Sequence, residues 1–473
     1  MSFQVHVAGP DDLVVQVYRQ LREAILDGRL RPGERLPATR ELARSAAVSR
    51  NTVSTAYERL LAEGFVTARV GSGTYVDGTA AGPRPAATAP GGILRPRRAW
   101  RDLPLPAPEP PLPRYDLRPD APDATLFPLP SWRRLVTREL RAATLAGGRA
   151  DPAGHPALRA AVARWLGISR SIRTGPDAVL ITHGAQQALD LIGRVLVEPG
   201  DVVAVEEPGY PPVHRLFRSL GATVVGVPVD AEGLVVDALP AAARIVYTTP
   251  SHQFPMGVPL SPARRRALLA WADRHHSAII EDDYDSEFRF RKRPLEPLQS
   301  LDGSGRVIYV GTFSKTMLPA LRLGFLVAPA TLGPALLHAR QVCDLYGSTH
   351  TEAAMAAFLE EGLFARHLRT ATRAYGARHA LLLDALGDGP LSRWLAPVVS
   401  VAGLHLSAHL RPDAGVDAAT VAARAARAGV AVQTLGEFCL TPPARDGLVL
   451  GFGAIPTDRL PEALRLLARC LPG

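Results

Sequence analysis

Residues 306–315 have the sequence RVIYVGTFSK, and they indicate the fold class of the larger part of the chain. A nearly continuous apolar run of this length is typical of a strand that is buried on both faces of a parallel or mixed sheet. Similar runs, AVLITHG at 178–184 and SAIIEDDYD at 277–285 among them, alternate with helical patterns across residues 116–473. The pattern predicts an α/β domain whose ligand lies at the carboxyl ends of the strands.

The lysine that closes this stretch, Lys315, stands in a chain with almost no lysine. The chain has 54 basic residues, and all of them are arginines except Lys292 and Lys315. A lysine in a Gly/Ser-rich turn suggests that an amine is needed there, because arginine cannot form a Schiff base.

The apolar run at 277–285, which precedes the run that ends in Lys315, carries two residues of complementary chemistry, Asp282 and Tyr284. The acid could pair with a protonated ring nitrogen, and the tyrosine could donate to a phenolate oxygen. Residues 184–186 open a helix, where free N–H groups and the helix dipole suit a phosphate. Each residue taken singly could be an ordinary strand-end or packing residue, but the ordered set describes a site for pyridoxal 5′-phosphate (PLP).

Residues 11–76 carry a different pattern. Apolar residues recur at helical spacing over 13–28, and a short helix from Thr39 is followed by a tight turn and a second helix over 49–63. Two short strands then flank Gly71. Three helices and a two-stranded wing predict a winged helix-turn-helix, in which the second helix of the motif enters the major groove.

The start of that second helix has the chemistry of a DNA contact. Hydroxyl and amide side chains can contact phosphates or base edges, and arginine offers a fork for guanine or phosphate. The alternative is that these are solvated surface residues of a helical hairpin. The motifs LRPGERLP, TRELA, VSRNTVSTAYERL and GSGTYV resemble the GntR-type winged-helix regulators, which implies DNA contacts by two arginines and by the wing backbone. The candidate DNA-binding residues are Arg40, Ser49, Arg50, Asn51, Thr52 and Gly71.

The motifs EEPGYPP, IIEDDYD and the Ser-Lys turn make residues 116–473 resemble the fold-type-I aminotransferases, while TPSHQFPMG replaces their Asn-Pro-x-x-Pro-x-Gly turn. A winged helix joined to such a domain by the Pro-, Ala- and Arg-rich linker at 77–115 resembles the MocR/GabR family of bacterial regulators. The resemblance implies PLP held at Lys315, with Asp282 on the ring nitrogen, Tyr284 and His252 near the phenolate oxygen, and Tyr210 stacked on the ring. It assigns the phosphate to Gly184, Ala185, Gln186, Thr312, Ser314 and Arg322.

The chain departs from aminotransferases where they clamp the substrate α-carboxylate with an arginine close to the C-terminus. Gly447 stands near that place, and Arg445 is the nearest candidate for an effector contact. The hypothesis is a transcriptional regulator that binds double-stranded promoter DNA and senses PLP or an amino compound through the aldimine at Lys315. Vitamin B6 or amino-acid metabolism genes are the expected targets, and the weak carboxylate site favours PLP as the signal. The alternative is an active aminotransferase with an accessory DNA-binding domain.

The composition of the whole chain fits these interpretations. The 473 residues, 47% hydrophobic and 21% charged, exclude a mini-protein, a fibre and a wholly disordered chain. The sequence contains no long apolar run and no secretory signal pattern, so we expect a cytoplasmic protein without a membrane span. Cys343, Cys439 and Cys470 are scattered, which predicts neither a disulfide framework nor a metal site. We expect a homodimer, because fold-type-I sites are built at a subunit interface.

Overall fold

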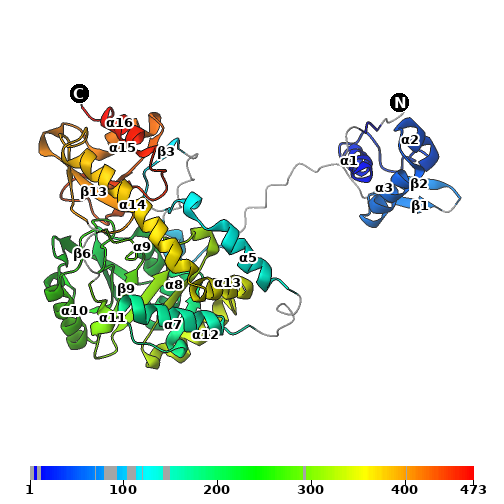
Figure 1. Cartoon of the computed structure of the whole chain (residues 1–473). Helices are drawn as coiled ribbons and strands as arrows, with labels where there is room; N and C mark the ends of the chain where they lie inside the picture. The colour runs from blue at the N-terminus through cyan, green and yellow to red at the C-terminus, as the bar shows by residue number, and fades with distance from the viewer. Residues whose placement is uncertain are drawn as a thin grey trace. The chain divides into compact units, whose positions relative to one another are not determined.

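The structure, a computed structural model, describes residues 5–7, 12–69, 71–78, 93–103, 113–119, 121–141, 150–290, 295–400 and 402–472. The chain divides into two compact units, Met1–Arg95 and Pro96–Gly473 (Figure 1). The interval predicted as a linker, 77–115, spans this division. Its residues 79–92 and 104–112 lie outside the described residues.

The N-terminal unit is the winged helix-turn-helix that the sequence predicts. Side chains cap two of its helices: the Asp12 carboxylate accepts from the Val14 N–H at 2.9 Å, and Ser49 Oγ accepts from the Thr52 N–H at 3.0 Å. The helices are α1 (Leu13–Leu26), α2 (Thr39–Ser45) and α3 (Arg50–Ala62), followed by the antiparallel strands β1 (Val66–Arg69) and β2 (Gly73–Val76). Apolar residues from these elements form one core, among them Val17, Leu21, Leu42, Val53, Leu60, Val66 and Val76.

An eight-stranded mixed sheet is the centre of the second unit. The strands lie in the order β4-β11-β10-β9-β8-β5-β6-β7. From β10 to β6 the neighbouring strands run parallel, whereas β11 is antiparallel to β10 and β4, and β7 is antiparallel to β6. The strands are β4 (Val179–Thr182), β5 (Val202–Glu207), β6 (Thr223–Asp230), β7 (Gly233–Leu234), β8 (Ala243–Thr248), β9 (Ala278–Asp283), β10 (Val307–Thr312) and β11 (Gly324–Val327).

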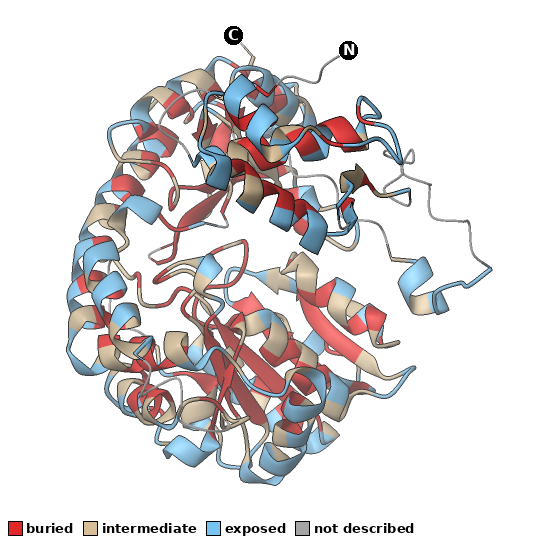
Figure 2. Ribbon diagram, turned by 90° about the vertical axis from the view of Figure 1, so that its right-hand side faces the viewer, coloured by how far each residue is buried: buried red, intermediate tan, exposed pale blue. Residues whose placement is uncertain are grey.

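Helices cover both faces of this sheet (Figure 2). Because neighbouring strand residues point to opposite faces, Val203 and Val205 share a core with α8, α9 and α12, while Ala204 shares one with α10. The confirmed α/β fold therefore explains the continuous apolar runs. The helices around the sheet are α4 (Arg98–Arg101), α5 (Leu129–Glu139), α7 (Pro156–Arg170), α8 (Gly184–Leu196), α9 (Pro211–Ser219), α10 (Pro262–His275), α11 (Leu298–Leu301), α12 (Gly333–Asp344) and α13 (Thr349–Glu360).

A smaller C-terminal layer, the small domain, follows the long helix α14 (Leu363–Gly387) and shares a core with it. Its antiparallel sheet has the order β12-β13-β16-β15, and a second pair joins β14 to β3 in parallel. Among the described residues, no helix combines the length and the apolar character that crossing a membrane requires. The elements are β3 (Tyr115–Asp116), β12 (Leu395–Pro397), β13 (His405–Leu410), α15 (Ala418–Arg427), β14 (Val430–Ala431), β15 (Gln433–Thr434), β16 (Gly447–Gly451) and α16 (Leu460–Ala468).

Candidate functional site

A cavity of ≈ 250 Å³ lies where the carboxyl ends of β5, β8, β9 and β10 meet the start of α8. This is the edge at which parallel sheets bind ligands. The cavity is lined by Ala185, Gln186, Tyr210, Tyr247, Thr249, Phe254, Asp282, Tyr284, Thr312, Ser314, Lys315, Pro319 and Arg322. The structure thus brings together all of the cofactor residues suggested by the sequence except Gly184, which adjoins the cavity at Ala185, and His252.

The two adjacent acids at the end of β9 have different surroundings. Asp282 Oδ2 accepts from the Tyr247 hydroxyl at 2.8 Å, while its buried Oδ1 has no hydrogen-bond partner among the described residues. Burial raises the pKa of Asp282 to about 7. Asp283 accepts from Arg170 Nε at 2.9 Å and from the Tyr309 hydroxyl at 2.6 Å. Burial favours the neutral form of Asp283, but the Arg170 charge and these bonds outweigh it and lower its pKa. Oδ1 of each acid lacks a partner among the described residues, but of the two only Asp282 lines the cavity, so Asp282 is the acid that a ring nitrogen there would meet.

Hydrogen-bond donors gather at the start of α8. Arg322 Nη2 donates to the His183 carbonyl at 2.6 Å, and a Cβ added to Gly184 would lie 3.4 Å from Arg322 Nη1. Gly184 itself has φ +75°, a conformation that favours glycine. Thr312 Oγ1 accepts from the Ser314 N–H at 3.1 Å and lies 3.0 Å from Ser314 Oγ. A guanidinium, two hydroxyls and the first N–H groups of a helix are donors that suit a phosphate.

Aromatic rings form another part of the cavity wall, called here the aromatic end. The rings of Tyr210 and Phe254 lie edge to face with centroids 5.7 Å apart, and those of Phe254 and Tyr284 have the same separation. Apolar side chains also pack against these rings. The residues of the cluster behind them are Met256, Leu435, Phe438 and Val449.

Tyr247, Thr249 and Phe254 line the cavity although they were not predicted from the sequence. All three belong to β8 or to the loop after it, in the run YTTPSHQF. The end of an apolar strand was the signal that identified the other cavity residues, and β8 carries the same signal.

Two candidates from the sequence lie away from the cavity. His252 is buried behind Tyr284, whose hydroxyl lies 2.9 Å from His252 Nδ1. Arg445 is exposed and does not line the cavity; it lies near His409, whose pKa is lowered by burial and by the Arg445 charge. Neither side chain is placed to contact a ligand in the cavity directly.

The N-terminal unit exposes most of its candidate DNA contacts. Arg40, Arg50 and Asn51 are exposed around the starts of α2 and α3. Ser49 is exposed too, but its Oγ accepts from the Thr52 N–H and lies 2.8 Å from Thr52 Oγ1, so these hydroxyls cap α3. The sixth candidate, Gly71, lies in the exposed turn between the two wing strands, with φ +75°. The exposed side chains and the wing remain the proposed contacts with DNA.

Two families match the two parts of the chain. Residues 13–76 match the bacterial regulatory proteins of the gntR family, and residues 119–445 match the aminotransferases of class I and II. The chain is 37% identical to the probable rhizopine catabolism regulatory protein MocR of Rhizobium meliloti over 466 residues, which cover 96% of this chain and 92% of that protein. The chain belongs to the MocR-type regulators of the GntR family. It is also 33% identical to the pyridoxine biosynthesis regulator PdxR of Corynebacterium glutamicum over 451 residues, 95% of this chain and 94% of that one.

Solved aminotransferase structures share the fold of the second unit of this MocR-type regulator. One is the α-aminoadipate aminotransferase LysN from Thermus thermophilus, complexed with N-(5′-phosphopyridoxyl)-L-leucine. The TM-score is 0.68 and the identity 30%, over 75% of this chain and 91% of that one.

The cofactor of this MocR-type regulator is PLP. The residues of the cavity fit the group on independent grounds. The unpartnered oxygen of Asp282 suits a ring nitrogen, the amine of Lys315 suits an aldehyde, and the donors around Arg322 suit a phosphate.

Proposed function

We propose that the effector of this PLP-binding transcriptional regulator is PLP itself, and that occupancy of the cavity at Lys315 sets how a cytoplasmic homodimer binds promoter DNA. The chain combines a GntR-type winged helix with a PLP domain, and this combination supports coupling between the two ligands. Coupling requires that PLP binds the two DNA-binding states with different affinity.

The distribution of positive charge in the cavity carries this proposal. Among the described residues that line it, Lys315 and Arg322 are the only ones with a cationic side chain. Lys315 would bind the aldehyde of PLP, and Arg322 belongs to the group of donors that would bind its phosphate. The carboxylate of an α-amino acid would then lie unpaired beside the aromatic end, and burying an unpaired charge is costly. Arg445 does not compensate, because it is exposed elsewhere.

When bound, PLP supplies an electrophilic aldehyde and a ring that withdraws electrons. The side chains of the chain bind and orient it. Asp282, held by Tyr247, would keep the ring nitrogen protonated, because the buried acid lacks a partner for Oδ1. Tyr210 and Phe254 would enclose the ring face, and the start of α8 would fix the phosphate.

Transamination is the second candidate activity. The presence of both Lys315 and Asp282 in one cavity supports it, whereas the absence of a further cation among the described lining residues argues against turnover on α-amino acids. Steady-state assays with amino donors and a keto acid separate the two. Sustained turnover would establish the enzyme hypothesis.

The proposal is tested by the visible absorption spectrum of the purified protein, recorded beside Lys315→Ala and titrated with amines and amino acids. We expect a PLP band that the variant lacks and that α-amino acids leave unchanged. Arg445→Ala is the matched control and should behave as the parent protein. An amino acid that shifts the band at low concentration would overturn the choice of PLP as effector.

A further inference from the structure

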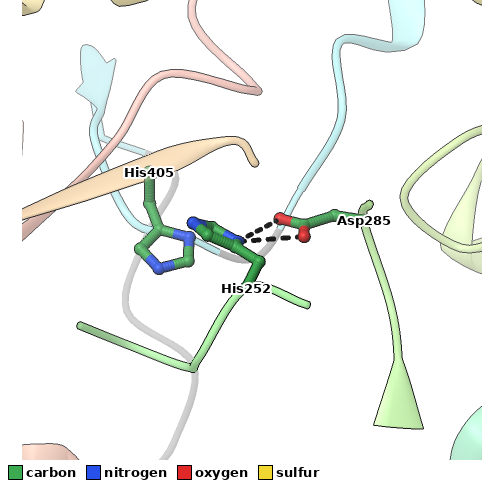
Figure 3. A group of neighbouring side chains, drawn as sticks. All are labelled: His252, Asp285 and His405. Atoms are coloured by element: carbon green, nitrogen blue, oxygen red, sulfur yellow. Dashed lines mark hydrogen bonds and ion pairs between the residues drawn. The ribbon is translucent and has the colours of Figure 1, made fainter. Parts of the chain in front are cut away.

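Four buried side chains form a connected cluster behind Tyr284, at the junction of the large sheet and the small domain. His252 comes from the loop after β8 and Asp285 from the loop after β9, whereas Ser400 and His405 belong to the small domain. Figure 3 shows His252 directed toward Asp285, with His405 beside it. These side chains are no more than 3% exposed.

His252 holds the centre of this cluster. Its Nδ1 lies 3.0 Å from Asp285 Oδ1 and 2.9 Å from the Tyr284 hydroxyl. Its Nε2 lies 3.1 Å from Ser400 Oγ. One imidazole therefore joins a cavity-lining tyrosine to the small domain.

The same cluster offers three side chains that could ligate a metal, but its packing argues against an ion. The rings of His252 and His405 have centroids 4.9 Å apart, and His405 Nε2 already bonds the Pro255 carbonyl at 3.0 Å. A Cβ added to Gly403 would lie 1.9 Å from His252 Cε1. Both nitrogens of His252 have partners, so the cluster is a closed hydrogen-bond network.

The order Ser400, His252, Asp285 is also that of a nucleophile, base and acid. Ser400 is 3% exposed and does not line the cavity, so a substrate in the cavity has no access to its hydroxyl. Ser400 Oγ lies 3.1 Å from the Ala402 carbonyl, to which it donates. Its partners therefore belong to the protein.

The Tyr284 hydroxyl has one proton and more than one acceptor. It lies 2.9 Å from the His252 carbonyl oxygen, to which it can only donate. A phenolate oxygen in the cavity would compete for this proton, and His252 Nδ1 lies within hydrogen-bond distance of both the Tyr284 oxygen and Asp285. A ligand at Tyr284 thus changes the hydrogen bonding of His252 without touching it.

Hydrogen bonds to backbone groups also hold the segment around Ser400 and Gly403 in the small domain. The Gly403 N–H donates to the Phe288 carbonyl at 2.8 Å, and the His379 ring bonds the Ser400 carbonyl at 3.0 Å. Ser400 and Gly403 come just before β13 in the chain. We therefore expect a change in the hydrogen bonding of His252 to affect the position of this strand of the small sheet.

We propose that His252 is a positioning residue that orients Tyr284 and, through Ser400, couples occupancy of the cavity to the small domain. This proposal rests on the proposed function, because the coupled ligand is PLP and the final response is DNA binding.

The two ring nitrogens allow a matched pair of variants. His252→Asn retains a donor at the Nδ1 position and loses the bond to Ser400, whereas His252→Gln retains a polar atom at the Nε2 position and loses the bond to Tyr284. Ser400→Ala removes the Ser400 bond from the other side. We measure the visible absorption of PLP on each full-length protein and the change in DNA affinity that PLP causes.

We expect His252→Asn and Ser400→Ala to keep the wavelength of the PLP band while the PLP effect on DNA affinity falls at least fivefold. We expect His252→Gln to shift the band, because Tyr284 then loses its bond to the imidazole and keeps only the bond to the backbone carbonyl of residue 252. Full retention of the PLP effect in both His252→Asn and Ser400→Ala would overturn the coupling, and an unshifted band in His252→Gln would overturn the positioning role.

The outcomes remain separable from failure of the proposed function. If PLP does not alter DNA binding by the parent protein, the proposed function and the coupling fail, while the band of His252→Gln still decides the positioning role. If a His252 variant does not fold, Ser400→Ala decides the coupling, and Asp285→Asn, which changes the partner of His252 Nδ1 without lining the cavity, decides whether the orientation of His252 affects the band.

Discussion

The two units hold their functional groups in opposite ways. In the N-terminal unit Arg40, Arg50 and Asn51 are exposed, and the partner proposed for them is DNA, although Arg50 Nε also donates to Thr39 Oγ1 at 3.4 Å. In the second unit Asp282 is buried and one of its oxygens has no partner among the described residues. Burying this oxygen lowers the unfolding free energy of the PLP-free protein. Substitutions of these exposed side chains should therefore change DNA affinity alone, whereas substitutions of the buried acids in the second unit should change stability as well.

The largest effect is expected for Asp283→Asn. The change leaves Arg170, which is 7% exposed, with Glu287 at 3.2 Å as its remaining counter-charge, and breaking the closer buried pair with Asp283 should cost up to about 3 kcal/mol of unfolding free energy. Urea unfolding of the second unit measures it. A midpoint equal to that of the parent protein would contradict the structural role assigned to Asp283.

Asp282→Asn is the matched substitution one residue away, and it should act on PLP. Losing a charged partner for the ring nitrogen should weaken PLP binding about 10- to 100-fold, measured by absorption titration. An affinity equal to that of the parent protein would show that Asp282 is not the ring partner.

The pH dependence of the PLP-free protein distinguishes the same two acids. The pKa of Asp282 is raised to about 7, whereas the unfolded acid titrates near 3.8. The folded state retains the proton between these values, so this group lowers the unfolding free energy as pH rises from about 4 to about 7. Asp282→Asn should show a smaller fall than the parent protein, because the buried Glu281 and Glu287, whose pKa values are also raised to about 7, still contribute to it. Urea midpoints at several pH values measure this slope, and a slope equal to that of the parent protein would contradict the assignment.

Arg50→Ala tests the exposed side chains of the N-terminal unit. The loss of one arginine fork should weaken DNA binding about tenfold and leave the PLP titration unchanged. Arg19→Ala, an exposed arginine on α1, is the control and should retain DNA affinity. Equal losses in both variants would mean that general charge, rather than the start of α3, determines binding.

Ser49→Ala should produce a smaller effect, on stability. Its hydroxyl caps α3, and losing such a cap costs about 1 kcal/mol. Thermal unfolding of the N-terminal unit measures the loss, and Ser49→Asp, which restores a capping acceptor, should recover it. No recovery would show that Ser49 does not act as a cap.

Arg445→Ala should change neither PLP binding nor DNA binding. Its side chain is exposed and does not line the cavity. A PLP affinity reduced several-fold, measured by the same absorption titration, would reinstate Arg445 as an effector contact.

Much of this architecture could be predicted from the sequence, because continuous apolar runs and turn motifs report local structure directly. Asp282 and Lys315 could be identified because each follows a continuous apolar run, the runs that form β9 and β10. Spacing could not reveal that Tyr247 bonds Asp282, since the two lie on different strands. The place of His252 behind Tyr284 was equally out of reach, because it depends on how loops from two domains pack.

Whether PLP itself is the effector can be decided by titrating PLP into the PLP-free protein bound to a DNA site selected from a random pool. Fluorescence anisotropy reports DNA binding, and absorption reports the cavity. We predict one common midpoint for both signals, no response in Lys315→Ala and no further change with α-amino acids. DNA binding that ignores PLP, or that responds only after an amine is added, would show that PLP is not the effector.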